Sequence, residues 1–448
     1  MFVMLEDSPR RLLILASKLG YQTRSFGEAA QKLGVEVLFA TDRCHQLEDP
    51  WDDHAIAVHF EQPQQAAFEI VKALDNVPVD AVLALGDRPT VAAAYTAKAF
   101  GLEHNSPAVT EACRSKLRQR EILRAAGLPV PPFFAFSLGE LPEIVAARAP
   151  FPCVVKPLSL SASQGVIRAN TPQEFSAAVA RIRRLLRSPE VQVTREPGLD
   201  RLLVEGYIPG AEVAVEGLLD EGELRVLAIF DKPDPLEGPF FEETIYVTPS
   251  RLPQPVQEQI ETCAQDATRA LGLISGPVHA EFRINEQGPW VLEIAPRPIG
   301  GLCSRALRFG PGEDGEMLFL EDLLVRHALH LPDADVPREP GASGVLMIPV
   351  PESGVFEGVN GVEEARAIRG VTELHITARL HDSIRAWPEG SSYLGFIFAL
   401  AETPETVEQS LREAHARLQF SIKESLPVEH AATGKLPPSL DRSGPKGR

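Results

Sequence analysis

The first hundred residues alternate short apolar runs with amphipathic stretches. Residues 12–16 and 81–85 are continuous apolar runs, which is typical of strands that are buried on both faces of a sheet. Between them, residues 25–33 have the apolar spacing of a helix, and residues 35–40 return to a strand pattern. Strands that alternate with helices predict a parallel sheet with helices on its faces. Ligands of such sheets bind beyond the carboxyl ends of the strands, so Asp87 is a candidate contact, although a plain turn there is the simpler explanation.

The middle of the chain follows another pattern, because its apolar runs come in pairs around tight turns. A basic helix is predicted at residues 113–126, where Gly127 and the prolines after it give a stop signal. A short run with β propensity follows at residues 152–156. Two pairs of antiparallel strands come next, at residues 204–219 with 224–230 and at residues 278–284 with 289–294. A new unit therefore begins near residue 107.

A last segment, at residues 341–420, again mixes helix and strand patterns. Beyond it the chain is rich in proline, glycine and charge, with little to bury. Because 448 residues are too many for one ordinary core, we predict an α/β protein in several parts. The parts are a Rossmann-like parallel-sheet domain at residues 1–107, a central domain at 108–335, an α/β domain at 336–425 and a disordered tail at 426–448.

Composition narrows the classes of function. The formal net charge of −18 disfavours binding to nucleic acid or to anionic membranes, because both attract basic faces. The five cysteines, of which Cys44 is the first, are scattered without a Cys-x-x-Cys pair, which disfavours a disulfide framework or a zinc–thiolate site. The chain begins without a signal-peptide pattern, and no apolar stretch approaches the ~20 residues that a membrane span needs. We therefore expect a cytoplasmic protein with small-molecule partners.

The first motif with candidate chemistry is a lysine followed by a serine-rich loop. Lys156 ends the β run, and residues 159–165 alternate serine with other residues up to Gly165. A lysine at a strand end is a fixed point charge, and the hydroxyl and backbone donors of such a loop suit phosphate oxygens. Ser161 and Gly165 are therefore candidate phosphate contacts. The alternative is a surface lysine beside an ordinary loop.

The second motif is an interrupted strand pattern. An apolar run ends at Glu205, passes through Tyr207 and Ile208, and resumes as a strand at Glu212. Such a chain reversal offers backbone donors and acceptors to a purine base, and a carboxylate beside it suits ribose hydroxyls. The alternative is a β-turn with solvent-facing glutamates, and the residues alone favour neither.

The third motif, the predicted hairpin, is the most specific. With Gly288 in the left-handed position of a three-residue turn, Glu281 on one strand faces Glu293 on the other. Two carboxylates paired across strands among apolar neighbours repel each other unless a cation lies between them, and Mg²⁺ that bridges phosphates fits this need. The alternative is a solvated hairpin with its glutamates outside. Candidate anion contacts follow at Arg297, Gly300 and Gly301.

In order and spacing these motifs resemble the ATP-grasp superfamily over residues 11–420. The resemblance implies an ATP-grasp fold, in which ATP lies between the two lobes of the central domain. It implies that Lys116 and Lys156 reach the ATP phosphates. It also implies that residues 205–208 form the hinge between the lobes.

The resemblance extends to the acidic and basic side chains of the family. It implies that Glu212 contacts the ribose, that Glu281 and Glu293 hold the metal ion, and that Arg297 binds the phosphate. Many ATP-grasp enzymes have an asparagine where this chain has Ala295, so a second metal ion would be held differently here.

One segment is similar to the L-amino acid ligases, which make dipeptides from unprotected amino acids. Residues 231–250 are similar to a loop of these ligases, and so is the C-terminal stretch from residue 341. The likeness implies that Glu243, Tyr246 and His279 lie near the amino-acid substrates, although several members have histidine where this chain has Tyr246.

The implied function is an ATP-dependent ligase that joins a carboxylate and an amine through an acyl phosphate. The implied cofactors and partners are ATP, Mg²⁺ or Mn²⁺ and amino acids, with a homodimer as the default assembly and with no nucleic acid or membrane. One alternative is an ATP-grasp ligase or carboxylase that acts on a carboxylate other than an amino acid. A dehydrogenase is disfavoured because no Gly-x-Gly-x-x-Gly follows the first strand. A module that binds ATP without catalysis stays open.

Overall fold

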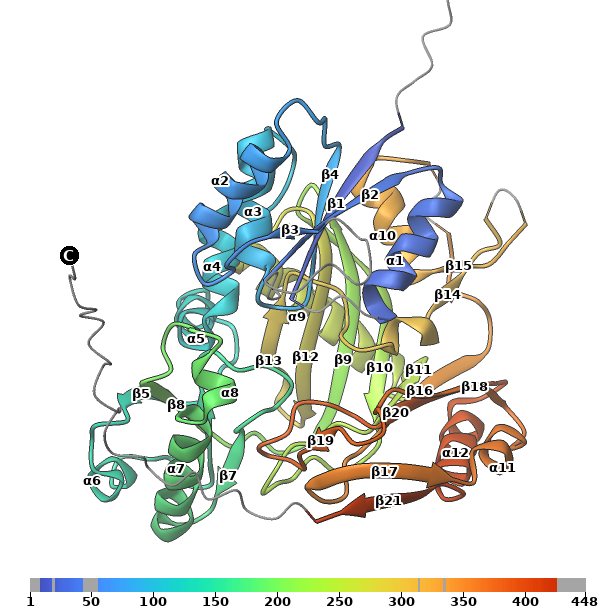
Figure 1. The fold of residues 1–448 in the computed structure, drawn as a ribbon. Coiled ribbons are helices and arrows are strands. Elements are labelled where there is room, and N and C mark those ends of the chain that lie inside the picture. Colours follow the sequence, from blue (N-terminus) through green and yellow to red (C-terminus); the bar gives the residue numbers. More distant parts are fainter. Residues whose placement is uncertain (1–8, 18–20, 43–54, 313–314, 333–335, 425–448) are drawn as a thin grey trace, which may run out of the picture.

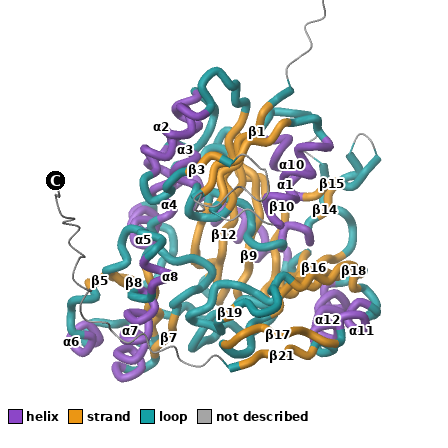
Figure 2. Tube along the Cα trace, viewed as in Figure 1, coloured by secondary structure: helices purple, strands orange, loops and turns teal. Residues whose placement is uncertain are grey.

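The computed structural model describes residues 9–17, 21–42, 55–312, 315–332 and 336–424. The predicted disordered tail and Cys44 lie outside the described residues. Figure 1 shows a parallel sheet at the top, long strands through the middle and two smaller units below. Helices lie on the outside of these sheets (Figure 2). The predicted α/β fold class is confirmed.

The N-terminal sheet is parallel, as the alternating pattern predicts. Its strands stand in the order β3-β2-β1-β4, and β1 pairs in parallel with β2 and β4. Leu12 and Ile14 of β1 pack with α1, whereas Leu13 and Leu15 pack with α2 and α3, so the sheet is buried on both faces. The elements are β1 Arg11–Ala16, α1 Tyr21–Lys32, β2 Glu36–Thr41, β3 Ile56–Ala57, α2 Pro63–Ala73, β4 Ala81–Leu85 and α3 Thr90–Phe100.

The predicted basic helix is in fact two helices, which corrects the single-helix prediction. α4 spans Pro107–Arg114 and α5 spans Lys116–Ala125, and Ser115 between them has an extended backbone. The Ser115 hydroxyl accepts a hydrogen bond from the Arg118 amide and so caps α5. Lys116 therefore stands in the first turn of a helix.

Residues 133–206 form a unit that we call the small lobe. Its four strands are antiparallel, in the order β5-β8-β6-β7, and α7 packs on them through the fully buried Phe175. The elements are β5 Phe133–Ser137, α6 Pro142–Ala146, β6 Cys153–Pro157, β7 Ile167–Ala169, α7 Pro172–Leu186, α8 Pro189–Gln192 and β8 Arg201–Gly206. The interrupted strand pattern around residue 205 is thus divided between two sheets, since β8 belongs here and β9 to the next sheet.

A large sheet of eight strands forms the centre of the molecule, in the order β13-β12-β9-β10-β11-β16-β20-β18. Both predicted hairpins are present, as β9 with β10 and as β12 with β13. Helix α9 packs on this sheet through residues such as Ile260 and Ala264. The elements are β9 Ala211–Asp220, β10 Glu223–Lys232, β11 Ile245–Thr248, α9 Gln254–Leu271, β12 Gly276–Asn285 and β13 Gly288–Ala295.

The C-terminal segment extends the large sheet and adds a small sheet, β19-β17-β21, beside it. Because β11 pairs with β16, the large sheet continues across the predicted border at residue 335, and the division into domains stays a prediction. The elements are η1 Cys303–Ala306, β14 Arg308–Phe309, β15 Leu318–Phe319, α10 Leu320–Ala328, β16 Ala342–Ile348, β17 Gly354–Asn360, α11 Val362–Arg366, β18 Val371–Ile376, β19 Ser383–Ile384, β20 Gly395–Ala401, α12 Pro404–His415 and β21 Gln419–Lys423.

Two features bear on the predicted environment of the chain. The cysteines at positions 113, 153, 263 and 303 are buried free thiols. Within the described ranges, no helix is both long enough and apolar enough to cross a membrane. The cytoplasmic location and the homodimer stay predictions.

Candidate active site

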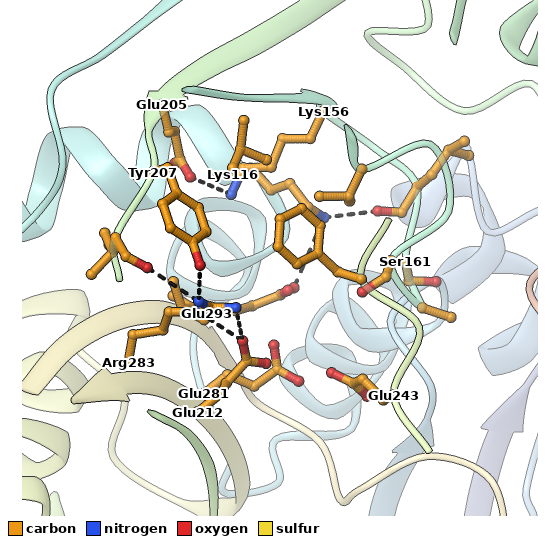
Figure 3. A pocket seen from close by; sticks show the side chains of 18 of the residues that line it. Lys116, Lys156, Ser161, Glu205, Tyr207, Glu212, Glu243, Glu281, Arg283 and Glu293 are labelled. Atoms are coloured by element: carbon orange, nitrogen blue, oxygen red, sulfur yellow. Dashed lines mark hydrogen bonds and ion pairs between the residues drawn. The ribbon is translucent and has the colours of Figure 1, made fainter. Parts of the chain in front are cut away.

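A cavity of about 750 Å³, including its open mouth, lies between the small lobe and the large sheet. Figure 3 shows two lysines on one side of it and several glutamates on the opposite side. Predicted residues from separate parts of the chain meet here. They are Lys116, Lys156, Ser161, Glu205, Tyr207, Ile208, Glu212, Glu243, Glu281 and Glu293.

The cationic end of the cavity is built around Glu205. Its carboxylate lies 2.6 Å from the Lys156 Nζ and 2.6 Å from the Arg120 Nε, and Arg120 also donates to the Leu292 carbonyl. Burial alone would raise the pKa of Glu205, but the two cations outweigh it and lower this pKa to about 2. Burial also lowers the pKa of Lys156, and Glu205 opposes that effect. The ionised glutamate therefore fixes the lysine at the cavity wall.

Lys116 reaches the cavity from the start of α5. Its Nζ donates to the Leu160 carbonyl at 2.8 Å and lies 4.0 Å from the Glu293 Oε1. Leu160 belongs to the serine-rich loop after β6, and Glu293 belongs to the hairpin of β12 and β13. One side chain thus connects the basic helix, the loop and the hairpin.

Three glutamates surround one buried lysine at the anionic end. The Lys232 Nζ lies 2.9 Å from Glu212, 2.6 Å from Glu243 and 3.0 Å from Glu281, and the side chain is 2% exposed. Burial disfavours the charged lysine, but the carboxylates outweigh it and raise the pKa of Lys232 well above its ordinary value. Burial likewise raises the pKa of Glu243 to about 7, against the opposing charge of Lys232. An internal cation therefore balances part of this acidic charge.

A second buried cation, His279, stands beside the same glutamates. Its Nδ1 hydrogen-bonds to Glu216, and its Nε2 lies 3.5 Å from Glu281. Burial would lower the pKa of His279, but Glu216 outweighs it and raises this pKa to about 9. Although burial opposes them, Lys232 and His279 hold the pKa of Glu281 well below its ordinary value. Glu281 therefore stays ionised between two cations.

The hairpin of β12 and β13 places Glu281 opposite Glu293, as predicted, but by another route. The turn has two residues instead of three, because Asn285 pairs with Gly288. In that register Glu281 would pair with Leu292, but a bulge shifts the pairing by one residue. Both glutamates then line the cavity. The predicted turn length was wrong, and the predicted cross-strand pairing of the two glutamates is confirmed, whereas their role as metal ligands stays a prediction.

The connection between β8 and β9 is held by Arg283 of β12. The Arg283 Nη1 donates to the Tyr207 hydroxyl at 2.9 Å and to the Ile208 carbonyl at 3.2 Å, and its Nε donates to Glu212 at 3.0 Å. The guanidinium is buried and lies 5.2 Å from the centre of the Tyr207 ring. Arg283 therefore fixes the predicted hinge, and Glu212 is shared between Arg283 and Lys232.

The remaining predicted side chains do not line the cavity. Tyr246 is buried beside the cavity, and its hydroxyl donates a hydrogen bond to Glu243 at 2.5 Å. His279 is also buried, and it contacts Glu281, which lines the cavity. Arg297 pairs with Asp87 of the N-terminal unit, at 2.7 Å between Nε and Oδ1. That these side chains contact substrate stays a prediction.

The predicted glycines have a packing explanation. Gly165 has φ +73°, and a Cβ there would lie 3.0 Å from the Pro157 side chain. Gly301 has φ +66°, and a Cβ there would lie 3.0 Å from the Phe396 ring. The Gly300 carbonyl accepts a bond from the amide of residue 303 at 3.4 Å. Backbone conformation and close packing therefore account for Gly165 and Gly301 before any anion is considered.

The small lobe is held on its C-terminal side by the segment before β20. The Glu389 carboxylate accepts hydrogen bonds from the Arg181 Nε at 2.5 Å and from its Nη2 at 2.8 Å. The Trp387 indole donates to the Ala162 carbonyl at 3.2 Å, and the Gly165 amide donates to the Pro388 carbonyl at 2.9 Å. The serine-rich loop is thus fixed from outside the lobe.

The small lobe is also held on its N-terminal side, by Glu196. This buried carboxylate accepts the Arg88 Nε at 2.6 Å and a second bond from Arg114. Arg88 also donates to the Thr194 carbonyl at 3.1 Å and lies 2.5 Å from Asp42. The small lobe therefore rests against both neighbouring parts of the molecule.

Two family models match the chain. The ATP-grasp domain matches residues 149–306, and the L-amino acid ligase C-terminal domain 2 matches residues 346–423. The chain contains an ATP-grasp domain and a C-terminal domain of the L-amino acid ligase type. The predicted family and the predicted ATP-grasp fold are confirmed. The predicted enzyme class is confirmed as well, because members of the ATP-grasp ligase family form carbon–nitrogen bonds at the expense of ATP.

Individual relatives give the same result for this ATP-grasp protein. A crystal structure of an L-amino acid ligase from Bacillus licheniformis is similar with a TM-score of 0.77 and 26% identity, over 93% of this chain and 99% of that chain. Alanine–anticapsin ligase of Bacillus amyloliquefaciens is 26% identical over 71% of this chain and 70% of its own length. Formate-dependent phosphoribosylglycinamide formyltransferase of Cupriavidus necator is also 26% identical, over 93% of this chain and 97% of its own length.

Sequence reasoning missed three basic residues that hold the ATP-grasp site, Lys232, Arg283 and Arg120. Each is separated from its partners by many residues, so spacing along the chain gives no warning. The available signal is a charge among apolar neighbours: Lys232 follows the apolar stretch 226–230, and Arg283 stands between Phe282 and Ile284. The same signal had singled out the hairpin glutamates.

Three carboxylates fit the divalent metal that ATP-grasp enzymes use, and of the predicted metal pair Glu281 is one of them whereas Glu293 is not. Glu212, Glu243 and Glu281 each offer an oxygen, and the three oxygens lie within 4.8 Å of one another. Hard carboxylate oxygens suit Mg²⁺ or Mn²⁺. Because Lys232 contacts the same three carboxylates, an ion bound among them would compete with this lysine. The choice of Mg²⁺ stays a prediction.

Proposed function

We propose that this chain joins two amino acids by an amide bond, through an acyl phosphate made from ATP. One observation carries the proposal: lysines and glutamates face each other across a single cavity of an ATP-grasp domain. A C-terminal domain of the L-amino acid ligase type continues the same sheet. The arrangement suits a triphosphate at the cationic end and an amino acid near the anionic end.

In the first step, a carboxylate oxygen of one amino acid attacks the γ-phosphorus of ATP. The bond from this phosphorus to the bridging oxygen breaks, and ADP leaves with the electron pair. Lys116 and Lys156 balance the charge on the phosphate oxygens. Glu281 and Glu293 would hold the divalent ion, which would supply further positive charge beside the phosphates. The loop at residues 159–165 covers the nucleotide and keeps water from the acyl phosphate.

In the second step, the amine nitrogen of the other amino acid attacks the acyl carbon. The carbon–oxygen bond to phosphate breaks, phosphate leaves with the electron pair, and the amine proton passes to phosphate or solvent. Glu243 holds the incoming amine, Tyr246 orients Glu243 from behind, and His279 stands beside them. Arg297 and the backbone of Gly300 stabilise the charge that develops on oxygen. A strong protein base is unnecessary because phosphate is a good leaving group.

The test is amino-acid-dependent formation of ADP and phosphate. The purified protein is incubated with ATP, Mg²⁺ and single or paired amino acids, and products are identified by mass spectrometry. We expect ADP and a dipeptide in equal amounts with at least one pair. ADP formation that no amino acid stimulates would remove the dipeptide proposal.

The metal assignment has a matched control within one hairpin. Glu293→Gln should reduce turnover at least 100-fold because a charged ligand beside the phosphates is lost. Glu286 stands exposed in the turn of the same hairpin, so Glu286→Gln should keep wild-type turnover. An active Glu293→Gln variant would contradict the assignment.

A second candidate is a ligase that acts on a carboxylate other than an amino acid. The formyltransferase relative supports it, because the similarity spans nearly the full length of both chains. Replacing the amino-acid pair in the same assay by formate with phosphoribosylglycinamide separates the two candidates. ADP formed only with the latter pair would favour this second function.

A further inference from the structure

Asp87 follows β4 of the N-terminal sheet and pairs with Arg297, which follows the hairpin of β12 and β13. The Asp87 Oδ1 accepts the Arg297 Nε at 2.7 Å, and its Oδ2 accepts the Nη2 at 3.3 Å. The two side chains are 25% and 13% exposed, and 210 residues separate them along the chain. The contact has the two-point geometry that fixes a guanidinium in a plane.

The pair leaves part of the guanidinium for a ligand. Arginine has five N–H groups in a rigid fork. Asp87 takes two of them, and the Pro298 carbonyl takes one from Nη1 at 3.0 Å. Within the described part of the chain, the terminal nitrogens of Arg297 thus keep two N–H groups, in a direction that Asp87 sets.

The location of Asp87, the acidic member of the pair, points to the reaction. Asp87 lines a second, narrow cavity together with Lys116, Ser161 and Glu293, about 360 Å³ including its open mouth but with only about 20 Å³ open to water. These last three residues also line the main cavity, so the two cavities are adjacent at the cationic end. The N-terminal sheet therefore supplies a wall where the phosphates and the reacting carboxylate of the proposed reaction would meet.

The charge of the pair is stable at neutral pH. Burial would raise the pKa of Asp87, but Arg297 outweighs it and lowers this pKa. Because the carboxylate neutralises the guanidinium, Arg297 acts through the direction of its N–H groups more than through net charge. A misdirected N–H group is costly, since a displacement of about 1 Å at an active site can reduce a rate by about 100-fold.

We infer that Asp87 is a positioning residue, which holds Arg297 in the one orientation that serves the ligase reaction. The inference rests on the proposed function. It also assigns a role to the N-terminal unit beyond covering the large sheet: this unit orients a group that acts in the transition state. The alternative is an ion pair that only holds two parts of the molecule together.

The experiment separates these possibilities by kinetics. Asp87→Asn keeps the shape of the side chain but removes one acceptor oxygen, so kcat should fall about 10- to 100-fold while KM for ATP changes less than twofold. Asp80 stands at the opposite end of β4, where it accepts the Arg11 amide at 2.7 Å. Asp80→Asn should therefore keep the wild-type kcat. Thermal unfolding of each variant confirms that the fold is retained.

A double-mutant cycle tests whether Asp87 acts through Arg297. Arg297→Lys should lower kcat, and adding Asp87→Asn should lower it no further. Independent, multiplying effects would overturn the inference, as would an Asp87→Asn variant with unchanged kcat and only a lower midpoint of unfolding. If the wild-type protein forms no ADP with any substrate pair, the proposed function fails and this inference falls with it. If the wild type is active and the cycle is additive, only the inference fails.

Discussion

Glu205 offers the sharpest test of how the site is held together. It is 4% exposed and accepts bonds from two cations, Lys156 and Arg120, each at 2.6 Å. Glu205→Gln keeps the size of the side chain but leaves both cations without a charged partner. We expect the free energy of unfolding to fall, because breaking a buried ion pair on one side leaves an uncompensated charge.

The magnitude follows from the titration of the carboxylate. Lowering the pKa of Glu205 from 4.5 to about 2 corresponds to about 3 kcal/mol of favourable interaction with the ionised form. Loss of one partner from a buried pair costs about 3–5 kcal/mol, which is the same range. Since the folded pKa is the lower one, this stabilisation is complete above pH 4.5 and is lost as the pH falls through about 2.

The assay is urea-induced unfolding followed by circular dichroism, at pH 7 and at steps below pH 4.5. At pH 7 the Glu205→Gln variant should be less stable by about 3 kcal/mol, and the difference should shrink toward pH 2. Glu121→Gln is the control, because Glu121 pairs with Arg118 on the exposed side of α5, where such pairs contribute less than about 0.5 kcal/mol. A loss of stability in Glu205→Gln that is equal at all pH values would refute the reasoning.

Two further predictions concern buried charged residues that stabilise the site without binding ATP. Lys232→Met removes the cation among three carboxylates and should lower the free energy of unfolding by about 3–5 kcal/mol. The measurement is the same urea titration, with a chelator present so that no metal ion replaces the lysine. Unchanged stability would contradict the role of Lys232 as an internal counter-ion. Glu196→Gln weakens the contact of the small lobe with Arg88 and Arg114, so the lobe should open more readily. A fluorescent ADP analogue should then dissociate several-fold faster, as measured by stopped flow. An equal dissociation rate would show that this contact does not limit release.

Much of the secondary structure could be read from the sequence, because its apolar periodicity is a local property. The predicted strand at residues 81–85 is β4 with the same bounds. Both hairpins of the large sheet were predicted from their turns and their apolar runs. The predicted basic helix failed at Ser115, where the capping preference of a serine outweighs the helical pattern on either side.

The candidate site was predictable where it lies in compact motifs. The lysine before the serine-rich loop, the interrupted strand and the hairpin were each visible as unusual charges beside apolar runs. Their meeting in one cavity was expected from the family resemblance and needed the structure to be seen. The bulge that brings Glu293 into line with Glu281 was not predicted from the sequence, because the apolar run through Leu292 also fits a regular strand.

The sequence by itself therefore determined the strands, the helices and the residues that carry charge into apolar surroundings. Only the tertiary structure decided which charges meet: Asp87 with Arg297 and Lys232 with three glutamates. The physical reason is that burial forces each ionised group to find a partner, while the choice of partner depends on how distant segments pack.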